Sequence, residues 1–149
     1  MNTIIPKRIV IDTNVCLDLF VFHDQRWNAI LEALQKGSLK AYTHPTCRDE
    51  WLAVLKYPHL PIETDDLQDI QSQFDQLIEC VAPPVLSNIK LPVCSDKDDQ
   101  KFLEIARDAD AHFLITKDKA LLKLAKRIRK LGLYSIETPE NFLRSQSSN

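Results

Sequence analysis

Four acidic residues of this 149-residue chain stand where a strand is expected to end or a helix to begin: Asp12, Glu50, Asp99 and Asp118. Asp12 and Asp118 follow apolar runs typical of strands, whereas Glu50 and Asp99 lie near the starts of helical patterns. If the strands are neighbours in a parallel sheet, the four carboxylates converge at its carboxyl edge, where such sheets bind ligands. Converging carboxylates repel one another, and a hard divalent cation such as Mg²⁺ or Mn²⁺ relieves that repulsion.

Each of these acids also has a simpler local interpretation. Asp12 could complete a turn, Glu50 could complement the dipole of a helix, and Asp118 could cap the helix that follows it. At least one of Asp96, Asp98 and Asp99, the acids at the start of the helix expected over 95–106, is expected to be a cap. Spacing to the apolar positions that follow favours Asp99 as the ligand there, with Asp96 in reserve.

Asn14 and Thr116 are polar neighbours of the predicted ligands, and both are candidates to orient them through hydrogen bonds. The alternative for Asn14 is a helix cap, and Thr116 could instead be no more than the last residue of a strand. The sequence leaves these alternatives open.

Other chemistries lack the residues they need. The only glycines, Gly37 and Gly132, both follow helical patterns as stop signals, so neither a phosphate-binding loop nor a dinucleotide fingerprint is present. No histidine cluster has metal-ligand spacing, and no serine or cysteine has a recognisable partner base. The four cysteines show no paired short spacing, which favours reduced thiols in a cytoplasmic protein: Cys16, Cys47, Cys80 and Cys94.

Composition predicts one soluble domain. Hydrophobic residues make up 44% of the chain and charged residues 27%, and the net charge is -2. We expect a single domain over residues 1–144 and a polar, disordered tail over residues 145–149. The longest apolar run, residues 9–22, is broken by acids and is too short to cross a membrane, which takes about 20 residues.

Charge is distributed unevenly along the chain. Residues 63–79 carry acids without lysine or arginine, and residues 117–130 carry seven basic residues against one acid, Asp118. The basic segment could follow a polyanion, dock an acidic partner, or simply be a solvated helix face.

Strand and helix patterns alternate along the sequence. Strands are expected at 8–11, 39–43, 112–116 and 133–136, and helices at 24–36, 46–55 with Thr46 as cap, 64–80, 95–106 and 121–131, before a helical turn at 139–143. This alternation predicts an α/β fold, a three-layer α/β/α sandwich with a mostly parallel sheet.

The motifs together resemble the PIN-domain family. The opening strand and first acid are in IVIDTNV at 9–15, the second-acid helix in RDEWL at 48–52, and the third-acid helix in DKDDQKFL at 96–103. LITKDKALL at 114–122 is similar to the fourth block, although Lys117 and Ala120 stand where the family often has glycine and an acid. The resemblance spans nearly the whole chain and is closest to toxin components of toxin–antitoxin pairs.

The resemblance implies a Mg²⁺-dependent endoribonuclease in which Asp12, Glu50, Asp99 and Asp118 form the catalytic metal site. It also implies an RNA substrate, a small antitoxin partner and a homodimer, and the short apolar run predicts no association with a membrane. Candidates for contact with the RNA backbone are Arg48, Lys117 and Lys119.

Two alternatives stay open at this point. A phosphatase of the haloacid dehalogenase type also begins with a strand and an aspartate, but that family wants a second aspartate where Asn14 stands. A non-catalytic module that binds RNA or an antitoxin would keep the PIN-like fold without turnover.

Overall fold

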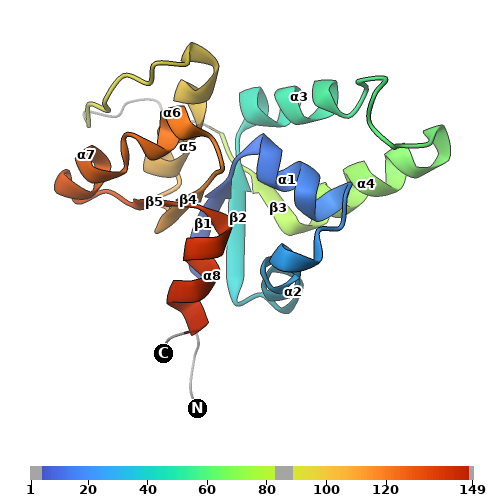
Figure 1. The fold of residues 1–149 in the computed structure, drawn as a ribbon, viewed down its shortest axis with the longest axis horizontal. Coiled ribbons are helices and arrows are strands. Elements are labelled where there is room, and N and C mark those ends of the chain that lie inside the picture. Colours follow the sequence, from blue (N-terminus) through green and yellow to red (C-terminus); the bar gives the residue numbers. More distant parts are fainter. Residues whose placement is uncertain (1–4, 83–88, 148–149) are drawn as a thin grey trace.

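The computed structural model in Figure 1 describes residues 5–82 and 89–147 of the chain. Five parallel strands form one sheet in the order β3-β2-β1-β4-β5. Their bounds are β1 Lys7–Ile11, β2 Leu39–Thr43, β3 Ile78–Cys80, β4 Phe113–Ile115 and β5 Ser135–Glu137. The α/β fold with a parallel sheet predicted from the sequence is confirmed.

Helices connect the strands and cover the sheet. They are α1 Thr13–Phe20, α2 Asn28–Lys36, α3 Pro45–Val54, α4 Thr64–Leu77, α5 Gln100–Asp108, α6 Lys119–Leu122, α7 Ala125–Lys130 and α8 Pro139–Ser147. Two short 3₁₀ turns, η1 Gln25–Trp27 and η2 Lys97–Asp99, precede α2 and α5. No helix in the described part of the chain is both long and apolar enough to cross a membrane.

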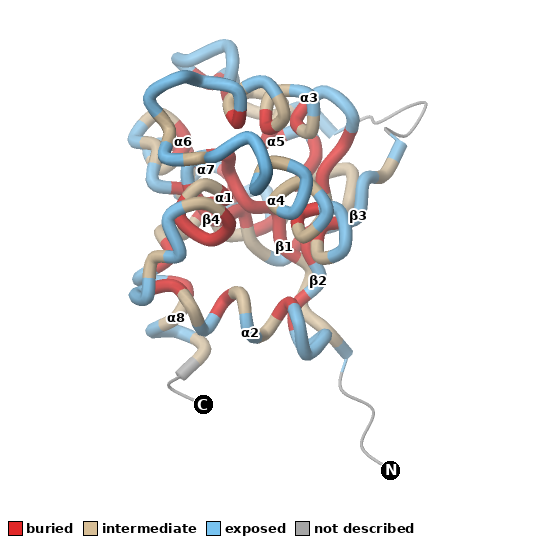
Figure 2. The backbone as a smooth tube through the Cα atoms, turned by 90° about the vertical axis from the view of Figure 1, so that its right-hand side faces the viewer, coloured by how far each residue is buried: buried red, intermediate tan, exposed pale blue. Residues whose placement is uncertain are grey.

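The central strand β1 is buried on both faces. Ile9 and Ile11 point into one hydrophobic cluster with side chains of α1, α2 and α4, while Val10 belongs to a second cluster with α5, α6 and α7. Figure 2 shows this buried centre surrounded by exposed outer helices. A strand covered on both faces has a continuous apolar run as its sequence, which is the pattern of residues 9–11.

Two elements differ from the sequence expectation near the first acid and at the sheet edge. The helix α1 begins immediately after Asp12, whose carbonyl accepts hydrogen bonds from the amides of Val15 and Cys16. Its apolar residues continue the run of β1, so the sequence pattern does not mark the change from strand to helix. The helix expected over 64–80 ends at Leu77, because Ile78–Cys80 pairs instead with β2 as an edge strand.

Helix ends account for the remaining differences. His44, rather than Thr46, caps α3, because the His44 ring accepts a hydrogen bond from the Thr46 amide. The expected basic helix divides into α6 and α7 where the amide of Leu124 bonds to the carbonyl of Leu121, three residues back. Helix α8 includes residues 145–147, where a disordered tail was expected, and residues 148–149 lie outside the described part.

Candidate metal centre

Asp12 is the central acid of the site, and the fold holds it firmly. Its amide donates to the carbonyl of Ile115 at 2.9 Å, which continues the pairing of β1 with β4 beyond the last strand residues. Its carboxylate Oδ2 accepts a hydrogen bond of 2.6 Å from the hydroxyl of Thr116. Asp12 is 3% exposed and Thr116 is completely buried, so this contact is shielded from water.

The Thr116 hydroxyl joins two of the predicted acids. While it donates to Asp12, it also accepts a hydrogen bond of 2.9 Å from the backbone amide of Asp118. The Asp118 carboxylate Oδ1 accepts from the amide of Ala120 at 2.8 Å, which makes Asp118 the cap of α6. The cap and the ligand interpretations of Asp118 are compatible, because capping engages one of its two oxygens.

Asp96, Asp99 and Asp118 form a close group of acids. One carboxylate oxygen from each lies within 4.8 Å of the others. Asp99 ends η2 and directly precedes α5, and its Oδ2 is buried without a hydrogen-bond partner in the described part of the chain. Asp96, held in reserve on sequence grounds, therefore lies beside Asp99, although its own Oδ1 also caps η2.

Burial and repulsion change the acidity of this group. The pKa of Asp99 rises from 3.8 to about 7, first because of burial and then because of the hydrogen bond and charge of Asp118. Burial also raises the pKa of Asp12, with smaller contributions from the charges of Asp118 and Glu50, against the lowering effect of Thr116. No positive charge among the described residues is one of the main causes that act on either pKa.

Glu50 lies at the same edge of the sheet but outside this group. Its Oε1 accepts a 2.7 Å bond from the Lys101 ammonium, and its Oε2 accepts a 2.6 Å bond from the Thr13 hydroxyl. Sequence reasoning passed over Lys101, because nothing in its own segment indicates a partner 51 positions away on another helix. The only signal available in the sequence is that Lys101 follows Asp99 by two residues.

The three predicted RNA contacts differ in availability. Arg48 pairs with both oxygens of Asp75 on α4, at 2.9 and 2.8 Å. Lys117 donates a 2.6 Å bond to the buried Asp18 of α1, a pairing that no sequence pattern indicates. Lys119 is exposed and has no ion pair with any described residue.

Asn14, the other residue expected to orient a ligand, is exposed. No hydrogen bond joins its side chain to an acid of the site within residues 5–82 and 89–147. Thr116 makes the contact expected of it, whereas Asn14 does not.

The group fits a divalent cation. Its donors are all carboxylate oxygens, the ligands that Mg²⁺ and Mn²⁺ prefer. The buried Oδ2 of Asp99, which has no hydrogen-bond partner among the described residues, could be satisfied by a cation. Asp99, Asp118 and Asp96 would hold such an ion, with Asp12 close enough to repel Asp99 and Asp118 electrostatically.

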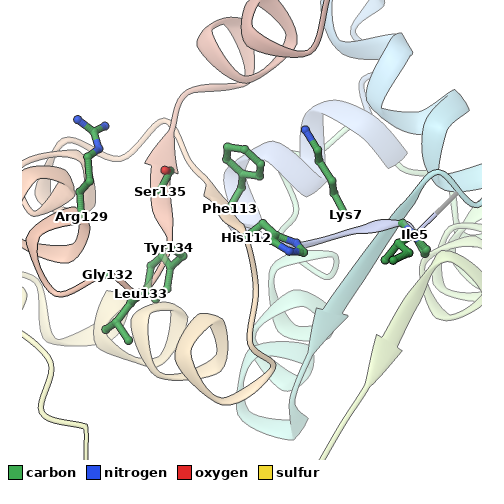
Figure 3. Close-up of a pocket in the computed structure, with 10 residues that line it drawn as sticks. Ile5, Lys7, His112, Phe113, Arg129, Gly132, Leu133, Tyr134 and Ser135 are labelled. Atoms are coloured by element: carbon green, nitrogen blue, oxygen red, sulfur yellow. The ribbon is translucent and has the colours of Figure 1, made fainter. Parts of the chain in front are cut away.

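A separate cavity of about 650 Å³ lies at the opposite end of the sheet. Figure 3 shows Lys7, His112 and Ser135 around it, at the amino ends of β1, β4 and β5, together with Tyr134 and Arg129. None of the predicted site residues lines this cavity. The concentration of acids, and not this hollow, therefore defines the candidate site.

Comparison with known proteins identifies the family of the chain. A family model described as PIN domain matches residues 8–120, which include all the acids of the site. The chain is also similar to an uncharacterized protein of Methanocaldococcus jannaschii, with 28% identity over 93% of this chain and 91% of that protein. No solved structure gives a significant match.

Proposed function

Because the chain belongs to the PIN-domain family, whose members are generally nucleases, we propose that it is a metal-dependent ribonuclease that hydrolyses phosphodiester bonds in RNA. The observation that carries the proposal is the group of Asp96, Asp99 and Asp118, with a buried carboxylate oxygen that has no partner among the described residues. When bound, Mg²⁺ or Mn²⁺ would offset charge on the attacked phosphate and favour ionisation of water.

The chain's own residues hold the site rigid. Thr116 fixes the orientation of the Asp12 carboxylate and, through the same oxygen, the backbone position of Asp118. Complete burial of Thr116 keeps water from competing for these hydrogen bonds. The carboxylates bind and orient, and none of them needs to form a covalent intermediate.

An exposed basic surface supports a polyanionic substrate. It consists of Lys119, Lys123, Lys126, Arg127, Arg129 and Lys130, all exposed on or between α6 and α7. Within the described part of the chain, Arg129 alone among them has an acid within 4.0 Å, namely Glu137. Helix α6 begins directly after Asp118, so the basic α6–α7 surface extends from the metal centre, and cations in such a place attract phosphate.

We place the protein in the cytoplasm as the endoribonuclease toxin of a toxin–antitoxin pair, with a small antitoxin as partner and a homodimer as the expected assembly. This part of the proposal rests on the resemblance of the sequence motifs. Co-expression with the product of a neighbouring gene, followed by a test of whether RNA cleavage is suppressed, examines it directly.

The decisive experiment compares RNA cleavage by the wild type and Asp99→Asn in Mg²⁺ and in EDTA. We expect cleavage only by the wild type with Mg²⁺, because asparagine keeps the volume of Asp99 but removes its charge. Asp110→Asn is the matched control: Asp110 is exposed, forms its ion pair with Arg8 away from the site, and has a backbone conformation, φ 52°, that asparagine also adopts.

Equal cleavage by wild type and Asp99→Asn, or cleavage that survives EDTA, would refute the proposal. RNA binding that is unchanged by Asp99→Asn and independent of metal, without any cleavage, would instead favour a non-catalytic RNA-binding module.

A further inference from the structure

We propose that Lys101 takes the place of a second metal ion, so that the chain binds one divalent cation at the Asp96, Asp99 and Asp118 group while the ammonium of Lys101 neutralises Glu50. The inference rests on the metal site of the proposed function and adds its stoichiometry. Lys101 acts as a positioning residue, because it holds Glu50 and needs no contact with substrate.

The contacts of Glu50 leave it little capacity for a metal. Lys101 occupies Oε1 at 2.7 Å and Thr13 occupies Oε2 at 2.6 Å. The side chains of Lys101 and Glu50 are only 17% and 29% exposed, so solvent screens their attraction less than it screens a surface ion pair. A metal ion that used Glu50 would have to compete with the Lys101 ammonium at Oε1.

Charge argues in the same direction. Two-metal sites place ions about 3.5–4 Å apart and need carboxylates on both sides to neutralise them. Here Asp96, Asp99 and Asp118 lie together and Glu50 lies outside their group, while Asp12 interacts electrostatically with both Asp118 and Glu50. A fixed ammonium on Glu50 provides positive charge beside the acids and repels a second divalent ion.

Lys101 differs from the other lysines near the site. Lys117 is bound to Asp18 through a 2.6 Å ion pair, outside the group of acids. Lys97 lies on η2, between Asp96 and Asp99, yet it is exposed and forms no ion pair with a described residue. Lys97 is therefore a control of equal charge and nearby position.

The test counts Mn²⁺ ions bound to the metal-free protein, by calorimetry and by the electron paramagnetic resonance signal of the free ion. We expect one ion per chain for the wild type, two for Lys101→Met, and one for Lys97→Met. Lys101→Arg should restore one ion, because it keeps the positive charge. The double variant Glu50→Gln with Lys101→Met should also bind one, since it removes the acid that the second ion needs.

The possible outcomes separate this inference from the proposed function. Two ions on the wild type, or one ion on both the wild type and Lys101→Met, would overturn the role of Lys101 and leave a metal-dependent nuclease standing. No Mn²⁺ on the folded wild type would overturn both. Circular dichroism checks folding, and Lys101→Gln, which removes the charge but keeps a hydrogen-bond donor, replaces Lys101→Met if that variant does not fold.

Discussion

At the scale of single residues, the site depends on carboxylates whose ionised forms are poorly compensated. Asp99 shows this most clearly, because burial and the neighbouring Asp118 raise its pKa to about 7. An unfolded chain has an aspartate pKa of about 3.9. The native and unfolded states therefore bind different numbers of protons at pH values between these two pKa values. The free energy of unfolding must depend on pH in that range.

The metal-free protein is expected to lose stability as the pH rises from about 4 to about 7. In this window native Asp99 keeps its proton while the unfolded chain has released it, so the native state binds more protons and the free energy of unfolding falls with pH. Asp12, whose pKa is also raised, contributes in the same direction. Urea unfolding in EDTA at several pH values measures the effect.

Asp99→Asn provides the reference for this measurement. As the pH rises, the free energy of unfolding of the wild type should fall relative to that of Asp99→Asn. Addition of Mg²⁺ at a pH of about 7.5, above the raised pKa of Asp99, should restore the stability of the wild type relative to the variant. If the difference in unfolding free energy between the two proteins stayed constant from about pH 4 to about pH 7, the raised pKa of Asp99 would be wrong.

Thr116→Val is expected to destabilise the protein by about 1–3 kcal/mol, the cost of leaving buried polar groups without a partner. Valine removes the hydroxyl that serves both Asp12 and the amide of Asp118. Thr116→Ser should lose less, because it keeps that hydroxyl. Thr43→Val is the control, since the Thr43 hydroxyl is buried but makes only a 3.5 Å contact with a neighbouring carbonyl. Equal losses at the two positions would count against a special role for Thr116.

The acids of the site were largely predictable from the sequence, and their other contacts were not. Asp12 and Asp118 follow strands that pair in parallel, and topology alone brings such positions together. The Lys101 contact with Glu50 depends on the relative rotation of two helices, α5 and α3, which periodicity does not specify.

At the scale of elements, an aromatic cluster fixes the helix that carries Glu50. Trp51 of α3 stacks on Phe74 of α4 with ring centroids 5.0 Å apart, and Phe20 of α1 meets both rings edge-on. All three side chains are buried. Because Glu50 directly precedes Trp51, the packing of this cluster determines where Glu50 lies.

Trp51→Ala is therefore expected to cost about 3–5 kcal/mol, the usual range for removing a buried large aromatic side chain. Leu52→Ala on the same helix should cost less, because Leu52 is only half-buried. Urea denaturation gives both values. A smaller loss for Trp51→Ala than for Leu52→Ala would mean that the cluster does not anchor α3.

Most elements are predictable from periodicity, and the exceptions have physical causes. Helix α1 escapes the pattern because its apolar residues follow those of β1 with only Asp12 between them. Strand β3 escapes it because Ile78 fits the helical spacing of α4 equally well. Ile78 is part of a strand because it pairs with Ala41 of β2, a residue distant in sequence.

At the scale of the whole molecule, charge is separated between two ends. Figure 1 places α7, within the basic α6–α7 surface, at one end of the long axis and α4 at the other. Asp65, Asp66, Asp69 and Asp75 lie on α4, and Lys126, Arg129 and Lys130 line a hollow of about 400 Å³ on α7. A polyanion approaching this molecule is attracted to one end and repelled from the other.

The salt dependence of RNA binding tests this polarity. Replacing Lys126, Arg129 and Lys130 with glutamine should weaken binding of single-stranded RNA to an Asp99→Asn background. It should also reduce the slope of log K against log salt by about 2, at roughly 0.7 for each phosphate that is no longer neutralised. The control is a second triple variant that removes the same charge from exposed lysines elsewhere, at Lys36, Lys40 and Lys56. It should leave the slope unchanged. Equal slopes for the two triple variants would exclude α7 as an RNA contact.

The pairing of β1 with β4 also sets the order in which the site is assembled during translation. Ile11 pairs with Ile115, and the Thr116 hydroxyl reaches back 104 positions to Asp12. During translation, Asp12 therefore emerges from the ribosome long before β4 and Thr116, which position it. The acids of the candidate site can come together only after most of the polypeptide has emerged, because the hydrogen bond between Thr116 and Asp12 joins residues 104 positions apart.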